Sequence, residues 1–141
     1  CCIYKRLEEA MIFEVGGKRM ADRPTEAYLR NTLRRMESDD NSFAVLSLDE
    51  NDYIQTAGDS QNGYVLEWCD GEARKHYYCA EDHLTIEDVI RVFTLYLQRN
   101  ENWKSDVIWD PLDLRNNSQR YSTTFMLAGG VFLLTILWLL I

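Results

Sequence analysis

The chain has 141 residues, a formal net charge of −8 and a hydrophobic content of 46%. Such an acidic chain is poorly suited to bind nucleic acid or an anionic lipid surface, and a basic protein partner fits it better. Four cysteines over this length do not make a disulfide scaffold, and they favour a reducing compartment. Ordinary solubility is the alternative explanation of the charge.

The first part of the chain predicts a hairpin. Residues 1–10 combine CCIY, which favours a strand, with KRLEEA, which favours a short helix. The chain starts at Cys1 and not at Met, so we expect that its true start lies upstream or was processed. Residues 11–15 (MIFEV) predict a strand, with a tight turn at Gly16-Gly17 and a short return after it.

A helix is predicted over residues 24–37, with Pro24 in its first turn. Its apolar residues recur at a spacing of three or four and predict one buried stripe, formed by Leu29, Leu33 and Met36. Basic residues fall mostly on the other side, and we expect a solvated face there and not a ligand site: Arg30, Arg34 and Arg35.

Four short apolar segments then predict strands over residues 43–48, 53–57, 64–69 and 74–79. The turn sequences DEND, GDSQNG and DG separate them. Short strands joined by such loops are typical of an antiparallel meander.

The clearest predicted helix covers residues 85–99, where Thr85 and Asp88 are spaced to form a capping box. Residues 105–109 (SDVIW) predict a last strand. One face of the helix is apolar and is expected to pack on the sheet: Ile86, Val89, Ile90, Phe93 and Leu97. The predicted fold class is therefore α+β, with an antiparallel sheet of about five strands flanked by two helices, over residues 1–110.

The C-terminal part differs in kind. Residues 111–120 are polar and predict a linker. Residues 121–141 carry no charge, whereas all 15 Lys and Arg and all 23 Asp and Glu lie before them. About 20 helical residues span roughly 30 Å, one hydrocarbon thickness, so this segment predicts a single transmembrane helix. A truncated chain, or a core helix of a larger assembly, is the alternative.

Orientation follows from the basic residues beside that segment. Lys104, Arg115 and Arg120 all lie on its N-terminal side, and no charge follows it. The positive-inside rule then predicts a single-pass membrane protein whose main domain is in the cytoplasm.

Cysteine and histidine gather in one stretch, which raises the question of zinc: Cys69, His76, Cys79 and His83. The spacing contains no CxxC or HxxxH pair, and strand alternation turns Cys79 away from Cys69 and His76. We therefore expect no metal and no other cofactor. The same alternation opposes a Cys79–His76 hydrolase, and GxSxG, P-loop, HExxH and GxGxxG motifs do not occur, so no enzyme is expected.

Pairing residues 64–69 with residues 74–79 across a four-residue turn sets Glu67 opposite His76. The face that carries Leu66 and Trp68 is expected to meet the helices. The other face mixes polar and aromatic residues, as protein-binding surfaces do. The predicted partner-binding residues are Gln55, Glu67, His76 and Tyr78 on that face, and Asp49, Glu50 and Asp52 in an acidic turn. A half-solvated sheet face, and a turn that is only solvated or holds Ca²⁺, are the alternatives.

Six segments together resemble a known family: LSLDENDYIQTA, GYVLEW, DG, KHYY, LTIEDVIRVFTLYL and NWKSDVIW. Over about residues 24–114, the chain is similar to the small α+β immunity proteins encoded beside bacterial polymorphic and contact-dependent toxins. The resemblance rests on a YIQ strand, an xLEW strand, a long helix followed by an aromatic-rich segment, and a closing Trp. It implies a single-domain inhibitor that binds a cognate toxin, expected here to be basic, and blocks it with no chemistry of its own.

The uncharged segment of residues 121–141 departs from the soluble pattern of that family. It favours a tethered inhibitor of a toxin that arrives through, or acts at, the inner membrane. The alternative is a tail-anchored adaptor, or a small subunit of a membrane complex, in which the helix itself makes the main contacts.

Overall fold

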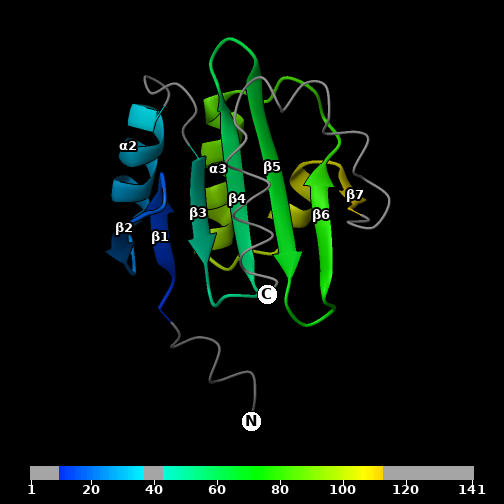
Figure 1. Cartoon of the computed structure of the whole chain (residues 1–141), viewed down its shortest axis with the longest axis horizontal. Coiled ribbons are helices and arrows are strands. Elements are labelled where there is room, and N and C mark those ends of the chain that lie inside the picture. The colour runs from blue at the N-terminus through cyan, green and yellow to red at the C-terminus, as the bar shows by residue number, and fades with distance from the viewer. Residues whose placement is uncertain (1–9, 37–42, 113–141) are drawn as a thin grey trace.

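The computed structural model describes residues 10–36 and 43–112 (Figure 1). Within these residues, seven strands form one antiparallel sheet in the order β2-β1-β3-β4-β5-β6-β7. The strands are β1 (Ile12–Val15), β2 (Lys18–Asp22), β3 (Phe43–Ser47), β4 (Tyr53–Asp59), β5 (Gly63–Asp70), β6 (Lys75–Cys79) and β7 (Trp109–Pro111). The helices in the same ranges are α2 (Glu26–Met36), α3 (Ile86–Leu97) and α4 (Trp103–Asp106). The predicted α+β class and antiparallel sheet are confirmed, with seven strands in place of about five.

The helices and one face of the sheet, which we call the inner face, enclose the core. α2 and α3 pack against each other, and α3 packs against β4 and β5 and lies behind the strands in Figure 1. The predicted stripe of α2 is confirmed, because Leu29 and Leu33 are fully buried. Every second residue of the central strands meets them, with Leu46, Ile54 and Leu66 fully buried. The face expected to meet the helices therefore does so.

The start of α3 is fixed by the predicted capping box. The Asp88 backbone N–H donates to Thr85 Oγ1 at 3.2 Å, and the Thr85 N–H donates to Asp88 Oδ2 at 2.8 Å. The helix ends at Leu97, two residues before the predicted end, and Arg99 then adopts a left-handed backbone with φ of 55°. The cap fixes the start of the helix that packs on β4 and β5.

The strand predicted over residues 105–109 is wrong. Residues Trp103–Asp106 form the short helix α4, and the last strand starts only at Trp109. Trp103 and Val107 are both buried, and their spacing of four residues suits a helical turn better than a strand. β7 then extends to Pro111 and Leu112 is buried, so these two residues of the predicted linker belong to the packed domain.

Both edges of the described sheet are poor templates for a further strand. In β2, the register against β1 skips Met20, which forms a bulge between Ala21 and the charged residue Arg19. The Tyr28 hydroxyl donates to the carbonyl of Met20 at 3.4 Å. β7 has three residues and ends in Pro111, which has no N–H to donate. We therefore do not expect partners to bind by adding a strand.

Candidate functional site

The sheet face opposite the helices, which we call the outer face, is polar and aromatic in β4, β5 and β6. It consists of Tyr53, Gln55, Glu67, Cys69, His76 and Tyr78. These residues alternate with the core residues of the same strands, which is why hydrophobic patterning alone assigns them to this side. The four strand residues predicted to form a mixed polar and aromatic surface, Gln55, Glu67, His76 and Tyr78, all lie on this face.

The pairing of β5 with β6 differs from the predicted one. Glu67 lies opposite Tyr78, and Cys69 lies opposite His76, so the predicted pairing of Glu67 with His76 is wrong by two positions. The pairing continues to Asp70, whose carboxylate then accepts two backbone N–H groups of the turn at 3.0 Å each. Since side chains alternate with a period of two, this shift keeps every residue on its predicted face.

One row of the outer face crosses β4, β5, β6 and β7. The Gln55 side-chain amide donates to Glu67 Oε2 at 2.6 Å, and the two residues are only 7% and 8% exposed. Tyr78 follows, and its hydroxyl donates to Asp110 Oδ2 at 3.4 Å. Asp110 was missed by sequence reasoning, because the last strand was expected to end before it.

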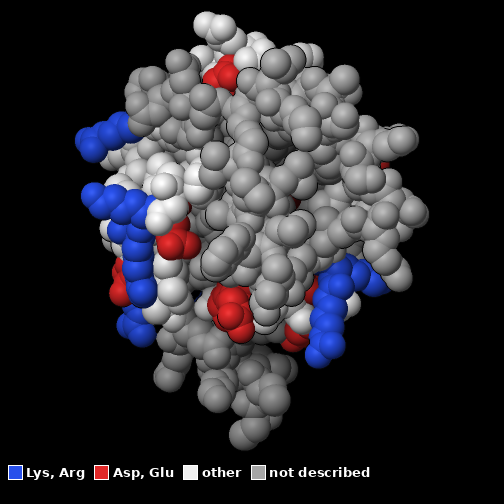
Figure 2. All heavy atoms as spheres, viewed as in Figure 1, with Lys and Arg blue, Asp and Glu red and all other residues white. Residues whose placement is uncertain are grey.

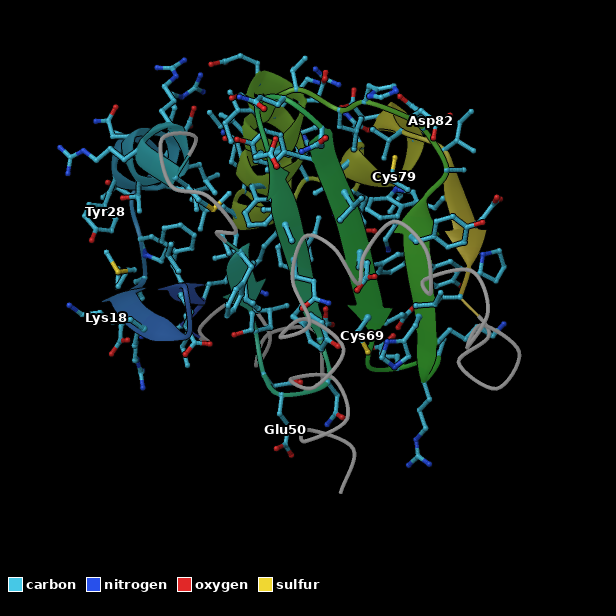
Figure 3. The ribbon with its side chains drawn as sticks, turned by 45° about the horizontal axis from the view of Figure 1, so that its top comes forward. Lys18, Tyr28, Glu50, Cys69, Cys79 and Asp82 are labelled. Carbon is cyan, nitrogen blue, oxygen red and sulfur yellow. The ribbon has the colours of Figure 1, made fainter. Side chains whose placement is uncertain are left out.

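A second row joins Tyr53, Cys69 and His76. Cys69 Sγ lies 3.7 Å from His76 Nε2. Sequence reasoning had tested His76 with Cys79, which is on the inner face at the other end of β6; Figure 3 shows Cys69 and Cys79 well apart. The signal for the correct pair was present, since alternation puts Cys69 and His76 on one face.

The protonation states of this pair argue against a cysteine nucleophile. Burial raises the pKa of the Cys69 thiol to about 11, and the charges of Asp52 and Asp70 act in the same direction. Burial lowers the pKa of the His76 imidazole. Burial therefore favours the uncharged form of both groups, whereas a cysteine nucleophile reacts as the thiolate.

The predicted acidic turn precedes β4. Asp49 Oδ1 accepts the backbone N–H groups of Asn51 at 2.7 Å and Asp52 at 2.9 Å. Asp52 Oδ1 accepts the hydroxyl of Tyr96, on α3, at 2.8 Å. Glu50 is exposed and points away from the sheet in Figure 3. Two of the three predicted carboxylates thus stabilise the turn, and Glu50 faces outward.

The turn between β5 and β6 adds further acidic residues at the same end of the sheet. Gly71 lies so close to Asn51 that a Cβ at Gly71 would come within 3.0 Å of its carbonyl oxygen. The two turns together form what we call the acidic end: Asp49, Glu50, Asp52, Asp70 and Glu72. Figure 2 shows acidic side chains over these turns, one group of basic side chains beside them at the lower right, and another group on the left, over α2 and β2. The exposed Arg74 and Lys75 lie where the second turn meets β6, so this end also carries basic residues.

Within residues 10–36 and 43–112, no group of three or more His, Cys, Asp or Glu is arranged to hold a metal ion. In the same ranges, no helix is long and apolar enough to cross a membrane. The predicted transmembrane segment, residues 121–141, lies outside the described residues.

Comparison with models of known protein families gives no match. Curated proteins and solved structures give no match either. The resemblance to immunity proteins therefore stays a prediction from the sequence.

Proposed function

We propose that the chain is an immunity-type protein that binds a basic toxin and blocks it without catalysis. The observation that carries this proposal is the position of the outer face beside the acidic end. A sheet face of polar and aromatic side chains, bordered by carboxylates, suits a partner that presents Lys and Arg. The family resemblance over residues 24–114 supports the same assignment.

The predicted contact residues take different parts in this proposal. Glu50 is exposed, and His76 and Tyr78 are half-buried, so these side chains contact the partner directly. Gln55 and Glu67 belong to the same outer face but are buried and hydrogen-bonded to each other, so in this proposal they hold the shape of that face. Asp49 and Asp52 hold the acidic turn in shape through the hydrogen bonds described above, and their charges contribute to attraction over distance.

Blockade in this proposal is steric and electrostatic. The acidic end steers a basic toxin toward the sheet, and the rigid outer face then covers its functional surface. Association should slow as ionic strength rises, because salt screens exposed charges. Residues 121–141 tether the inhibitor to the membrane, with the globular domain in the cytoplasm, where an incoming toxin emerges.

Co-expression with the product of the neighbouring gene tests the proposal. We expect the two proteins to co-purify, and the chain to protect cells against that product. Glu50→Lys should weaken capture, whereas Asp82→Lys should not, although both change the net charge equally. Asp82 is exposed at the opposite end of the sheet from Glu50 in Figure 3, so it is a matched control. Neither complex nor protection would remove the proposal.

A tail-anchored adaptor is the second candidate, favoured by the uncharged run of residues 121–141. Replacing this run with an unrelated apolar helix separates the two functions. A tethered inhibitor should still protect cells, because its binding surface is in the globular domain. An adaptor should lose its activity, because its helix makes the contacts.

A further inference from the structure

One corner of the outer face, where β6 meets β7 in Figure 1, carries an exposed apolar side chain. Ile108 is 64% exposed, whereas the next most exposed large apolar side chain of the described residues reaches 40%. Its chain neighbours Val107 and Trp109 turn toward the core, where Val107 is buried and Trp109 is partly buried. Alternation along the extended chain therefore places Ile108 on the same side as Asp110, on the outer face.

The backbone of Ile108 is fixed on both sides. Its N–H donates to Glu81 Oε1 at 3.1 Å, and its carbonyl accepts the N–H of Ala80 at 2.8 Å. Single exposed apolar residues are common on protein surfaces, but this one is held in place by two hydrogen bonds. A side chain that is already positioned loses less conformational freedom when a partner covers it.

Two further side chains of the outer face lie beside Ile108. Tyr78 is half-buried in β6 and lies opposite the exposed Asp110 in β7. The Tyr78 hydroxyl donates to Asp110 Oδ2 at 3.4 Å, a long hydrogen bond that uses one of several acceptor positions of the carboxylate. The carboxylate can therefore accept a stronger, charged donor as well.

The chemistry of this pair selects a guanidinium group. A guanidinium can pair with a carboxylate through two N–H groups and can also lie against an aromatic ring, whereas an ammonium group acts as a point charge. Lys75 is the one lysine of β6 and β7, and alternation turns it away from the side of His76 and Tyr78. The two strands thus set no lysine of their own on this side of the sheet.

We propose that Tyr78, Ile108 and Asp110, which we call the β6–β7 corner, are the main energetic contacts of the partner-binding surface. The partner presents an arginine next to an apolar side chain at this corner. The arginine pairs with Asp110 and lies against Tyr78, and the apolar side chain packs on Ile108. Tyrosine and arginine are enriched among the few residues that dominate binding energies. This inference rests on the proposed inhibitory function and adds Ile108 and Asp110 to its contact residues.

Affinity of the full-length chain in detergent for the immobilised product of the neighbouring gene tests the corner. Ile108→Ala and Asp110→Asn should each weaken binding by about tenfold or more. Tyr78→Phe keeps the ring and should bind more tightly than Tyr78→Ala. Matched controls are Met20→Ala and Asp22→Asn, an exposed apolar residue and an exposed carboxylate in β2 at the opposite edge of the sheet, and both should keep the affinity.

Salt separates the two kinds of contact. The loss from Asp110→Asn should shrink as ionic strength rises, because salt screens the ion pair, whereas the loss from Ile108→Ala should persist. Circular dichroism reports whether each variant retains the fold. If the parent binds and the folded Ile108→Ala and Asp110→Asn variants bind as tightly as the controls, the corner is overturned and the inhibitory function stands. If the parent itself does not bind, the inhibitory function is removed, and the corner with it.

Discussion

On the inner face of the sheet, Trp68 stacks on Tyr77 with ring centroids 4.6 Å apart and meets Trp103 edge-on at 4.7 Å. On the outer face of the sheet, polar side chains make directional contacts, such as the Gln55–Glu67 hydrogen bond of 2.6 Å. The inner contacts combine large apolar area with tight packing, which is where stability comes from. The outer contacts orient polar groups and contribute less. Changes to the two faces should therefore affect different properties of the molecule.

The largest effect is expected from Phe93→Ala, which opens a cavity between α3 and the sheet. Phe93 is fully buried. Loss of its side chain should lower the free energy of unfolding by about 3–5 kcal/mol. Urea unfolding followed by tryptophan fluorescence measures this free energy. Leu97→Ala, at a partly buried position of the same helix, serves for comparison. A loss as small as that of a surface substitution would contradict the packing of Phe93 between α3 and the sheet.

A smaller effect is expected from Gln55→Ala on the outer face. This substitution removes the amide that donates to the buried Glu67 carboxylate, and should cost about 1–3 kcal/mol of folding free energy. The same unfolding experiment measures it. In a double-mutant cycle with Glu67→Ala, the two losses should not add, because both remove one hydrogen bond. Strict additivity would show that the pair is not coupled.

Acid should destabilise α3, the helix that packs on β4 and β5. Hydrogen bonds from the Thr85 backbone and hydroxyl lower the pKa of Asp88. A carboxylate with a lowered folded-state pKa stabilises fully above its unfolded pKa, about 3.9, and this stabilisation is lost as pH falls through the folded pKa. The free energy of unfolding, measured between about pH 6 and pH 2, should therefore change less with pH in the Asp88→Asn variant than in the wild type. Equal slopes would contradict this role.

The smallest effect on stability is expected from Glu50→Gln at the acidic end. Glu50 is exposed, so the free energy of unfolding should change by no more than about 0.5 kcal/mol. Binding to the proposed basic partner should nevertheless weaken, by about two- to fivefold at low salt. Thermal unfolding measures the change in stability, and binding to the immobilised partner measures the change in affinity. Equal affinity at low and high salt would argue against electrostatic steering.

Much of the inner face could be predicted from the sequence. The spacing of Leu29, Leu33 and Met36 predicted the buried stripe of α2, and Thr85 with Asp88 predicted the start of α3. Period-two alternation assigned Leu66 and Trp68 to the core. Such features are local, because each depends on residues a few positions apart.

The remaining details depend on contacts between distant residues. The β5–β6 register depends on how Asp70 caps its turn, and a two-residue shift leaves the hydrophobic pattern unchanged. The Asp52–Tyr96 hydrogen bond joins residues 44 positions apart, and no periodicity signals it. Asp110 lies opposite Tyr78 on the outer face because residues 103–106 form α4, so that the last strand starts at Trp109 and not at residue 105 as predicted.

The irregular edges of the sheet have a consequence for edge-to-edge association when many copies of the protein lie close together. In the part of the chain that the structure describes, the bulge in β2 and the proline that ends β7 interrupt the rows of N–H and C=O groups through which neighbouring molecules could pair into a continuous fibril. Copies of the protein that lie close together should thus stay separate molecules and not join edge to edge.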